Sequence, residues 1–184
     1  EKEIGPIGAL TVNDGFTGPQ GGGPPAADPA QNAAAELARL LVARGIAVGP
    51  ADVGTAPADA KVIAKLTSAP LREILGGFLD SSDNLTGEML ARELAAKAGR
   101  PASTPNGVAE IKTELERLGL PTAGLLMVDG SGLARQNRAT CNLLQATIDL
   151  ARRPKFAAVA DGLSVAGVDG TLATRFTTRP LRGK

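Results

Sequence analysis

Three consecutive polar residues, Ser82, Asp83 and Asn84, lie between two stretches of the chain that have helical periodicity. A serine hydroxyl can relay a proton, and an asparagine amide can both donate and accept hydrogen bonds with an amide substrate. Ser82 and Asn84 are two residues apart in a tight turn, so both side chains can face one cleft. These residue types are also the ordinary ones of helix caps and turns, and for the tripeptide alone that structural role is the simpler interpretation.

The chain has no histidine and one cysteine, Cys141. Without histidine, Ser-His-Asp and Cys-His catalysis are excluded, and we expect neither a zinc site nor any other metal or cofactor. Hydrolytic chemistry would therefore need a different base, for which lysine is the usual substitute. One cysteine cannot form a disulfide within the chain. Cys141 lies in an apolar helical pattern with Leu144 and Ile148, which predicts that it is a small core residue.

Five helices are predicted around these residues, because apolar side chains recur at three- and four-residue spacing between start and stop signals. Asp28 and Thr104 are the expected N-caps of the first and the fourth helix. In the third helix, Leu85, Met89 and Leu94 are expected to face inward. The predicted helices span residues 29–44, 68–81, 85–98, 105–118 and 138–152.

Short apolar runs predict a few strands in addition to the helices. A turn signal, Asn13-Asp14-Gly15, follows the first run, and the Gly- and Pro-rich stretch 18–29 is predicted to be a loop. The length of 184 residues predicts one domain. The predicted strands are residues 7–12, 46–48, 61–66 and 125–128.

The charge balance excludes some classes of partner. Lys and Arg number 20 against 19 Asp and Glu, and only 2% of the residues are aromatic. This composition argues against a nucleic-acid-binding surface, which needs basic clusters and stacking rings. No run approaches the roughly 18 apolar residues that span a membrane, and no signal peptide is evident. The opening without Met indicates a processed or excised segment.

Four segments contain sequence motifs that extend beyond these local patterns. They are GALTVNDG at residues 8–15, FLDSSDNLTGEML at 78–90, VDGSGLARQNR at 128–138 and LSVAGVDGTLATRF at 163–176. They resemble, in the same order, segments of the penicillin-binding D-alanyl-D-alanine carboxypeptidases and endopeptidases of the penicillin-binding protein 4 type, peptidase family S13. The second segment is similar to that family's Ser-Asp-Asn motif and the helix start after it. Each match is short, but their shared order along nearly the whole chain makes the set specific.

The resemblance implies a fold. It predicts the α/β (α+β) class, as part of a serine β-lactamase/DD-peptidase (transpeptidase-like) domain with a helical cluster beside an incomplete antiparallel sheet. Residues 1–184 would form one portion of that catalytic domain. Within it, 1–67 would hold a sheet strand, the Gly/Pro loop and the first helix, 68–120 the helical subdomain, and 121–184 the return toward the sheet.

The resemblance also implies roles for particular residues. The family cleaves peptidoglycan stem peptides through an acyl-enzyme and is inhibited by β-lactams. By similarity, Ser82 would relay a proton, Asn84 would orient the substrate amide, and Asp83 would anchor the turn. Ser131 and Arg135 match a segment that lines the pocket for the peptide side chain, where an arginine suits a carboxylate. A solvated arginine at a helix start is an equally simple interpretation of Arg135.

The chain also departs from the family's pattern. Of the three active-site motifs, it contains Ser-Asp-Asn and lacks both the nucleophilic Ser-x-x-Lys and the Lys-Thr-Gly strand. We therefore expect this piece alone to be inactive and to need a complementing segment of its own polypeptide, because an exposed sheet edge invites pairing. The alternative is an inactive structural or binding fragment, or a pseudo-enzyme, of the same fold. The expected partners are stem peptides, β-lactams and the rest of the polypeptide, and the expected location is extracytoplasmic.

Overall fold

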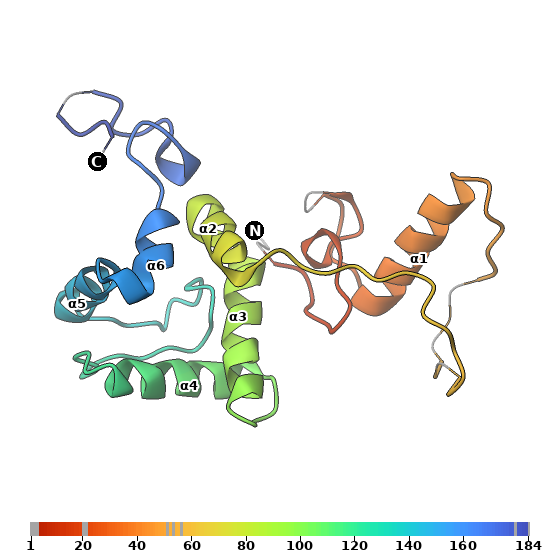
Figure 1. The fold of residues 1–184 in the computed structure, drawn as a ribbon, viewed down its shortest axis with the longest axis horizontal. Coiled ribbons are helices and arrows are strands. Elements are labelled where there is room, and N and C mark those ends of the chain that lie inside the picture. The colour runs from red at the N-terminus through yellow and green to blue at the C-terminus, as the bar shows by residue number, and fades with distance from the viewer. Residues whose placement is uncertain are drawn as a thin grey trace. The chain divides into compact units, whose positions relative to one another are not determined.

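The computed structural model describes residues 4–19, 22–50, 52, 54–55, 57–178 and 180–183. The chain divides into two compact units, Glu1–Thr67 and Ser68–Lys184, and Figure 1 shows the helices of each. Among the described residues, no helix has both the length and the apolar character needed to cross a lipid bilayer.

The first unit contains the 3-10 turn η1 (Asn13–Gly15) and the helix α1 (Pro29–Val42). The Asp28 carboxylate accepts hydrogen bonds from the backbone N–H groups of Ala30 and Gln31, at 2.9 and 3.1 Å. This confirms the predicted N-cap and start of the first helix, both of which depend on neighbours within one turn.

The predicted strands are not found. In the part of the chain that the structure describes, residues 7–12, 46–48, 61–66 and 125–128 form no strand, and the only bridges join Phe16 to Pro25 and Leu126 to Arg138. The antiparallel sheet is therefore not confirmed. A strand exists only through hydrogen bonds to a neighbouring strand, and among the described residues these runs find no such neighbour beyond the single bridge at Leu126. Within 61–66, Ile63 remains 98% exposed.

The second unit is helical. Its long helices are α2 (Leu71–Ser81), α3 (Asn84–Lys97), α4 (Thr104–Arg117) and α5 (Cys141–Ala151), and α6 (Ala157–Asp161) follows the 3-10 turn η3 (Pro154–Phe156). A last 3-10 turn, η4 (Gly170–Leu172), lies near the end. The four helices predicted for this unit are all present, and only their bounds differ from the prediction. The fourth starts one residue early because Ser103, not Thr104, caps it, and the fifth starts at Cys141 because Thr140 caps it.

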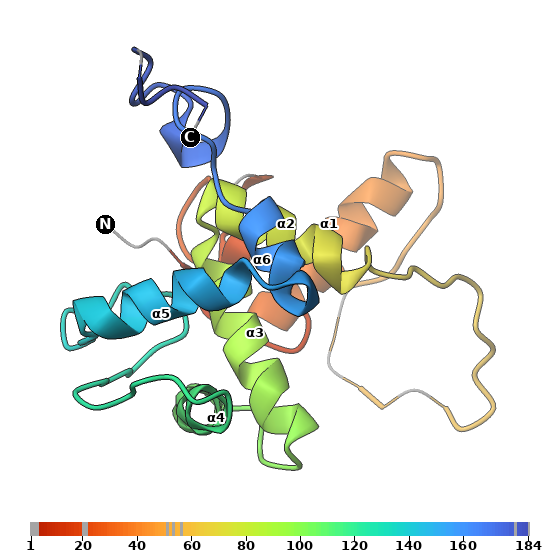
Figure 2. The same cartoon turned by 60° about the vertical axis from the view of Figure 1, so that its left-hand side comes forward.

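Small residues let α3 and α4 pack closely. Ala91 and Ala95 of α3 are buried, and a β-carbon added to Gly107 of α4 would lie 2.4 Å from the backbone oxygen of Ala91. Figures 1 and 2 show α4 running across α3 rather than alongside it. The missing side chain at Gly107 is what allows the two backbones to touch at this crossing.

The predicted inward faces of two helices were wrong in part: Leu85 and Met89 of α3 are half-buried, but Leu94 is not. In α3, Leu94 is 40% exposed, because the tight crossing selects alanine and glycine instead of leucine for the buried face. In α5, Leu143 and Leu150 are buried, whereas Leu144 and Cys141 are exposed. The Cys141 prediction fails because the buried stripe is displaced by one residue, about 100° around a helix.

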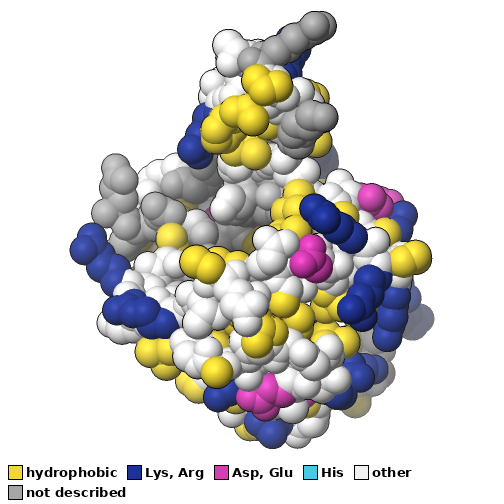
Figure 3. Space-filling view, turned by 90° about the vertical axis from the view of Figure 1, so that its left-hand side faces the viewer, with side chains coloured by type: hydrophobic (Ala, Val, Ile, Leu, Met, Phe, Trp, Pro, Cys, Tyr) yellow, Lys and Arg dark blue, Asp and Glu magenta, His cyan; other side chains and the backbone are white. Residues whose placement is uncertain are grey.

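Large apolar side chains of the second unit remain open to solvent. Figure 3 shows hydrophobic side chains at the surface among Lys and Arg side chains on this face. Those of the second unit that are at least 40% exposed are Leu71, Leu94, Leu126, Val128, Leu133, Leu144, Ile148, Leu163, Val168, Phe176 and Leu181. Single exposed leucines are normal, but this many in one small unit is typical of a surface that another segment covers.

Candidate functional site

The 82–84 turn joins α2 to α3. Ser82 is the C-cap of α2, with φ 58° and ψ 48°, and its N–H donates to the carbonyl of Phe78. This left-handed conformation costs a non-glycine residue roughly 1–2 kcal/mol. The side chain of Ser82 is exposed. A serine is therefore held here in a conformation that glycine would adopt more easily, a kind of strain that is concentrated at functional sites.

Asp83 caps the next helix. One carboxylate oxygen accepts from the backbone N–H groups of Leu85 and Thr86, at 3.0 and 3.3 Å, and the other accepts from the Thr86 hydroxyl at 2.6 Å. Asn84 is the first residue of α3 and is half-buried. The cap directs the carboxylate back into the helix, and Ser82 and Asn84 flank it on either side.

Glu88 brings a distant segment to α3. This side chain is only 5% exposed. Its Oε1 accepts from the N–H of Gly130 at 2.8 Å and from both the N–H and the hydroxyl of Ser131 at 3.0 Å. Its Oε2 accepts from the Thr104 hydroxyl at 3.0 Å. Sequence reasoning missed this residue; the signal present was a carboxylate four positions after Asn84, on the same helical face.

Asp129 organises the turn that Glu88 holds. Its carboxylate accepts from the N–H groups of Gly132 and Ala134 and from the Asn137 side chain, at 2.9, 2.6 and 2.7 Å. Partial burial by itself raises the pKa of Asp129, but hydrogen bonds from Asn137, Ala134 and Gly132 outweigh it and hold the pKa below its usual range. We call residues 129–132 the 129–132 turn.

The two predicted substrate-binding residues, Ser131 and Arg135, differ in their burial and in their contacts. Ser131 is half-buried and lies against α3 through Glu88. Arg135 is exposed, and its backbone carbonyl accepts from the Arg138 guanidinium at 2.6 Å. The fold therefore brings Ser131 to the helix that follows the 82–84 turn, while the Arg135 side chain projects from the loop after it.

The 163–176 segment contacts the end of α2, two residues before the 82–84 turn. The hydroxyl of Ser164 donates to the backbone oxygen of Asp80 at 3.1 Å, one of the α2 carbonyls that has no partner within the helix. Gly170 has a φ of 51°, and a β-carbon there would lie 2.0 Å from a side-chain oxygen of Asp80. Sequence reasoning gave Ser164 no role, because its partner is 84 residues away.

A cavity of about 590 Å³ lies between α4, α5 and the loop that carries the 129–132 turn. Its wall is mostly aliphatic, and Ser131 belongs to it, whereas Ser82, Asn84 and Arg135 do not. The aliphatic part of the wall consists of Ile111, Leu115, Leu125, Leu126, Met127, Ala139, Leu143 and Leu144.

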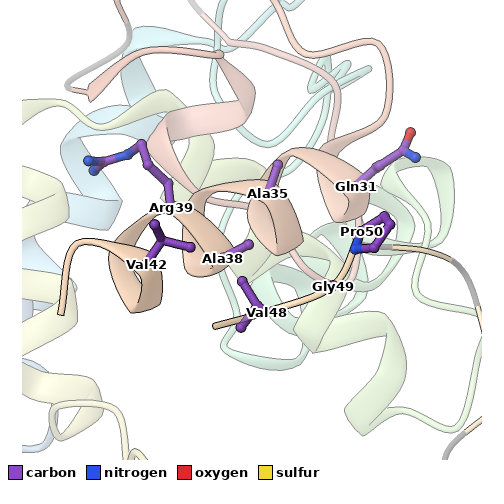
Figure 4. Close-up of a pocket in the computed structure, with 8 residues that line it drawn as sticks. All are labelled: Gln31, Ala35, Ala38, Arg39, Val42, Val48, Gly49 and Pro50. Carbon is purple, nitrogen blue, oxygen red and sulfur yellow. The ribbon is translucent and has the colours of Figure 1, made fainter. Parts of the chain in front are cut away.

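The first unit has a hollow of its own, of about 660 Å³, beside α1. Figure 4 shows its lining of small and aliphatic side chains, with Gln31 and Arg39 as the long polar ones. Arg39 is paired with Glu36 at 2.6 Å. The hollow contains none of the predicted site residues, and its open, apolar wall offers no group for hydrolytic chemistry.

No group of three or more His, Cys, Asp or Glu side chains that could hold a metal occurs within the ranges that the structure describes. The polar groups gathered at the candidate site are hydroxyl, amide and carboxylate groups of α2, α3 and the segments packed on them.

Comparison with known proteins gives consistent matches. The sequence profile of the D-Ala-D-Ala carboxypeptidase 3 (S13) family matches residues 23–184. The chain is 36% identical over 151 residues to a carboxypeptidase of Mycobacterium tuberculosis, which covers 80% of this chain and 32% of the relative. It is 35% identical over 158 residues to a D-alanyl-D-alanine carboxypeptidase of Actinomadura, covering 80% and 29%.

A solved structure agrees with these matches. Penicillin binding protein 4 of Haemophilus influenzae, crystallised with a β-lactam, superposes with a TM-score of 0.70 at 30% identity, covering 86% of this chain and 38% of that one. The chain thus spans about a third of the length of the proteins it matches. The profile covers most of the chain and includes three of the four segments in full, so the predicted resemblance is confirmed: the chain belongs to the D-Ala-D-Ala carboxypeptidase 3 (S13) family.

Proposed function

We propose that this chain is a section of a serine-type D-Ala-D-Ala carboxypeptidase or endopeptidase that cleaves peptidoglycan stem peptides and is acylated by β-lactams. The observation that carries the proposal is the 82–84 turn, where an exposed left-handed serine joins two helices in a chain of family S13. The name of the Actinomadura relative and the β-lactam bound to the Haemophilus protein support it.

In the proposed reaction, a serine outside these 184 residues attacks the carbonyl carbon of the penultimate D-alanine, and a nearby lysine takes its proton. The bond to the terminal D-alanine breaks and leaves an ester on the serine, which water then hydrolyses. Ser82 would carry the proton toward the leaving nitrogen, and Asn84 would hold the substrate amide. Asp83 would keep both in place through its cap of α3.

The peptide side chain would lie near the 129–132 turn. Ser131 is supported by Glu88, and the exposed guanidinium of Arg135 would pair with a carboxylate of the stem peptide. The reaction would take place outside the cytoplasm, where peptidoglycan is found.

The chain by itself is proposed to be inactive. It contains no Ser-x-x-Lys and no Lys-Thr-Gly, so neither the nucleophile nor its base is present among the 184 residues. The many exposed aliphatic side chains support the need for further segments of the same polypeptide.

Intact mass after incubation with benzylpenicillin tests the proposal. The samples are this chain and the longer protein that contains it, each with and without Ser82→Ala. The longer protein should gain one covalent adduct, the isolated chain none, and Ser82→Ala should slow formation or turnover of the adduct. A longer protein that stays unmodified would replace the peptidase proposal with the inactive fragment or pseudo-enzyme.

A further inference from the structure

Glu88 is a buried carboxylate to which the proposed reaction assigns no task. Burying a charged side chain is costly unless hydrogen bonds compensate for the lost water. Glu88 has such compensation, because four donors from two other segments, the 129–132 turn and the start of α4, point at its two oxygens. A carboxylate with so many partners fixes the groups around it more firmly than a leucine of the same volume would.

The position of Glu88 relates it to the 82–84 turn. Glu88 follows Asn84 by four residues in α3, so the two lie on one face of the helix, about 6 Å apart along its axis. The side chain that binds Gly130 and Ser131 therefore starts one helical turn from Asn84. Ser131 begins the stretch that continues to Arg135.

Close packing leaves the 129–132 turn little freedom to slide along α3. A β-carbon on Gly130 would lie 2.6 Å from the backbone oxygen of Gly87, and one on Gly87 would lie 3.0 Å from the backbone oxygen of Gly130. The two backbones are thus in direct contact, and the hydrogen bonds to Glu88 set the position at which they meet.

We propose that Glu88 is a positioning residue that holds Ser131 and the segment up to Arg135 in register with Ser82 and Asn84. The inference rests on the proposed function, in which Ser82 and Asn84 act on one part of the substrate and Ser131 and Arg135 bind another part. Glu88 would join these two groups of residues. Glu88 acts through the 129–132 turn and does not touch the substrate.

The hydrogen-bond pattern predicts which substitutions are tolerated. In Glu88→Gln, the amide oxygen can keep the three bonds to Gly130 and Ser131, and the amide NH₂ can donate to the Thr104 hydroxyl. In Glu88→Ala, two partly buried N–H groups lose their acceptor. Thr104→Val is the matched control, because it removes the bond to α4 and leaves the bonds to the 129–132 turn intact.

The first experiment measures the contact itself. Hydrogen–deuterium exchange of the longer protein, followed by mass spectrometry of peptides covering residues 129–132, should be faster in Glu88→Ala than in the wild type. Glu88→Gln and Thr104→Val should exchange like the wild type in these peptides. Unchanged exchange in Glu88→Ala would overturn the inference.

The second experiment measures the consequence for the reaction. The limiting rate of acylation by benzylpenicillin is measured at a temperature where every variant is fully folded. Glu88→Ala should lower this rate about 10- to 100-fold, the size of effect that a misplacement of about 1 Å caused by a substitution away from the reacting atoms produces. Glu88→Gln should recover most of the rate, and Thr104→Val should not lower it.

The outcomes separate the two proposals. If the wild-type longer protein is acylated and Glu88→Ala is acylated equally fast, the positioning role is wrong and the proposed function stands. If the acylation rate falls as far in Glu88→Gln as in Glu88→Ala, the inference is also wrong, because Glu88→Gln keeps the hydrogen bonds that position the 129–132 turn. If the wild type itself is not acylated, the proposed function fails and the role of Glu88 fails with it.

Discussion

Ser82 combines a reactive side chain with an unfavourable backbone. Its φ of 58° lies in the region that glycine adopts freely, and Asn13, Asp14 and Phe176 are the other non-glycine residues with positive φ in the described ranges. The conformation reverses the chain between α2 and α3 and leaves the hydroxyl exposed. Under the proposed function, stability would favour glycine at this position and the proton relay would require serine, an opposition that is common in active sites.

Ser82→Gly should raise the free energy of unfolding by about 1 kcal/mol, because the left-handed backbone is no longer strained. The same variant should lose the proton relay and acylate as slowly as Ser82→Ala. Chemical denaturation measures the first effect and benzylpenicillin acylation the second.

Ser81→Gly is the control, because Ser81 is the last helical residue of α2 and its hydroxyl donates to the carbonyl of Gly77. Glycine there should lower stability. A Ser82→Gly protein no more stable than the wild type would show that the strain is absent.

Asp129 should make stability depend on pH. Its pKa is lowered in the folded chain, so its hydrogen bonds stabilise the fold fully above the unfolded pKa of about 3.9 and lose this effect as pH falls through the lower folded value. The free energy of unfolding should therefore drop between about pH 4 and the folded pKa.

Asp129→Asn should lower stability at pH 7 and flatten this acid limb of the profile. The measurement is denaturant unfolding from pH 7 to pH 2. An acid limb that is as steep in Asp129→Asn as in the wild type would contradict the assignment.

At the scale of elements, α3 is the central helix of the site. Its N-terminus begins directly after the 82–84 turn, its first turns hold the 129–132 turn through Glu88, and its middle crosses α4 at Ala91 and Gly107. The 163–176 segment fixes the end of α2 through Ser164 and Asp80. The two helices that meet at Ser82 are thus each held by a segment from later in the chain.

Gly107→Ala should destabilise the second unit by about 1–3 kcal/mol, because the added methyl group would overlap the backbone of Ala91 and force the helices apart. Gly77→Ala is the matched control: Gly77 lies within α2 with open space around it. Alanine there should stabilise by about 0.5–1 kcal/mol through helix propensity.

Thermal and denaturant unfolding of both variants measure the difference. Equal shifts in the same direction would show that the close crossing of α3 and α4 does not exist. Opposite shifts are expected because one glycine is required by packing and the other is not.

At the scale of the whole molecule, the chain exposes apolar side chains in both units. Ile63 and Leu66 in the first unit are each 98% exposed, and the aliphatic cavity beside α5 is open in the second. Within the proposed longer protein, such surfaces are expected to be covered, because natural domains seldom leave large apolar patches in water.

The isolated 184 residues should therefore bind a hydrophobic dye and self-associate, whereas the longer protein should do neither. Sedimentation velocity and dye fluorescence at several concentrations make the comparison. Reversible, cooperative unfolding of the isolated chain as a monomer would contradict the expected need for a complementing segment.

The sequence by itself determined the five long helices, the cap at Asp28, the 82–84 turn between α2 and α3, and the family. These features depend on residues within one helical turn of each other, or on short motifs in a set order, so local patterns were sufficient.

Only the tertiary structure decided which faces are buried and which distant groups meet. Glu88 bonds residues 42 and 43 positions away, and Ser164 reaches back 84 positions to Asp80. Periodicity indicates an apolar stripe on a helix, but it does not indicate how closely the neighbouring helix approaches. For this reason the buried face of α3 contains Ala91 and not the predicted Leu94. Strands depend on partners far along the chain, so the predicted sheet could not follow from apolar runs alone.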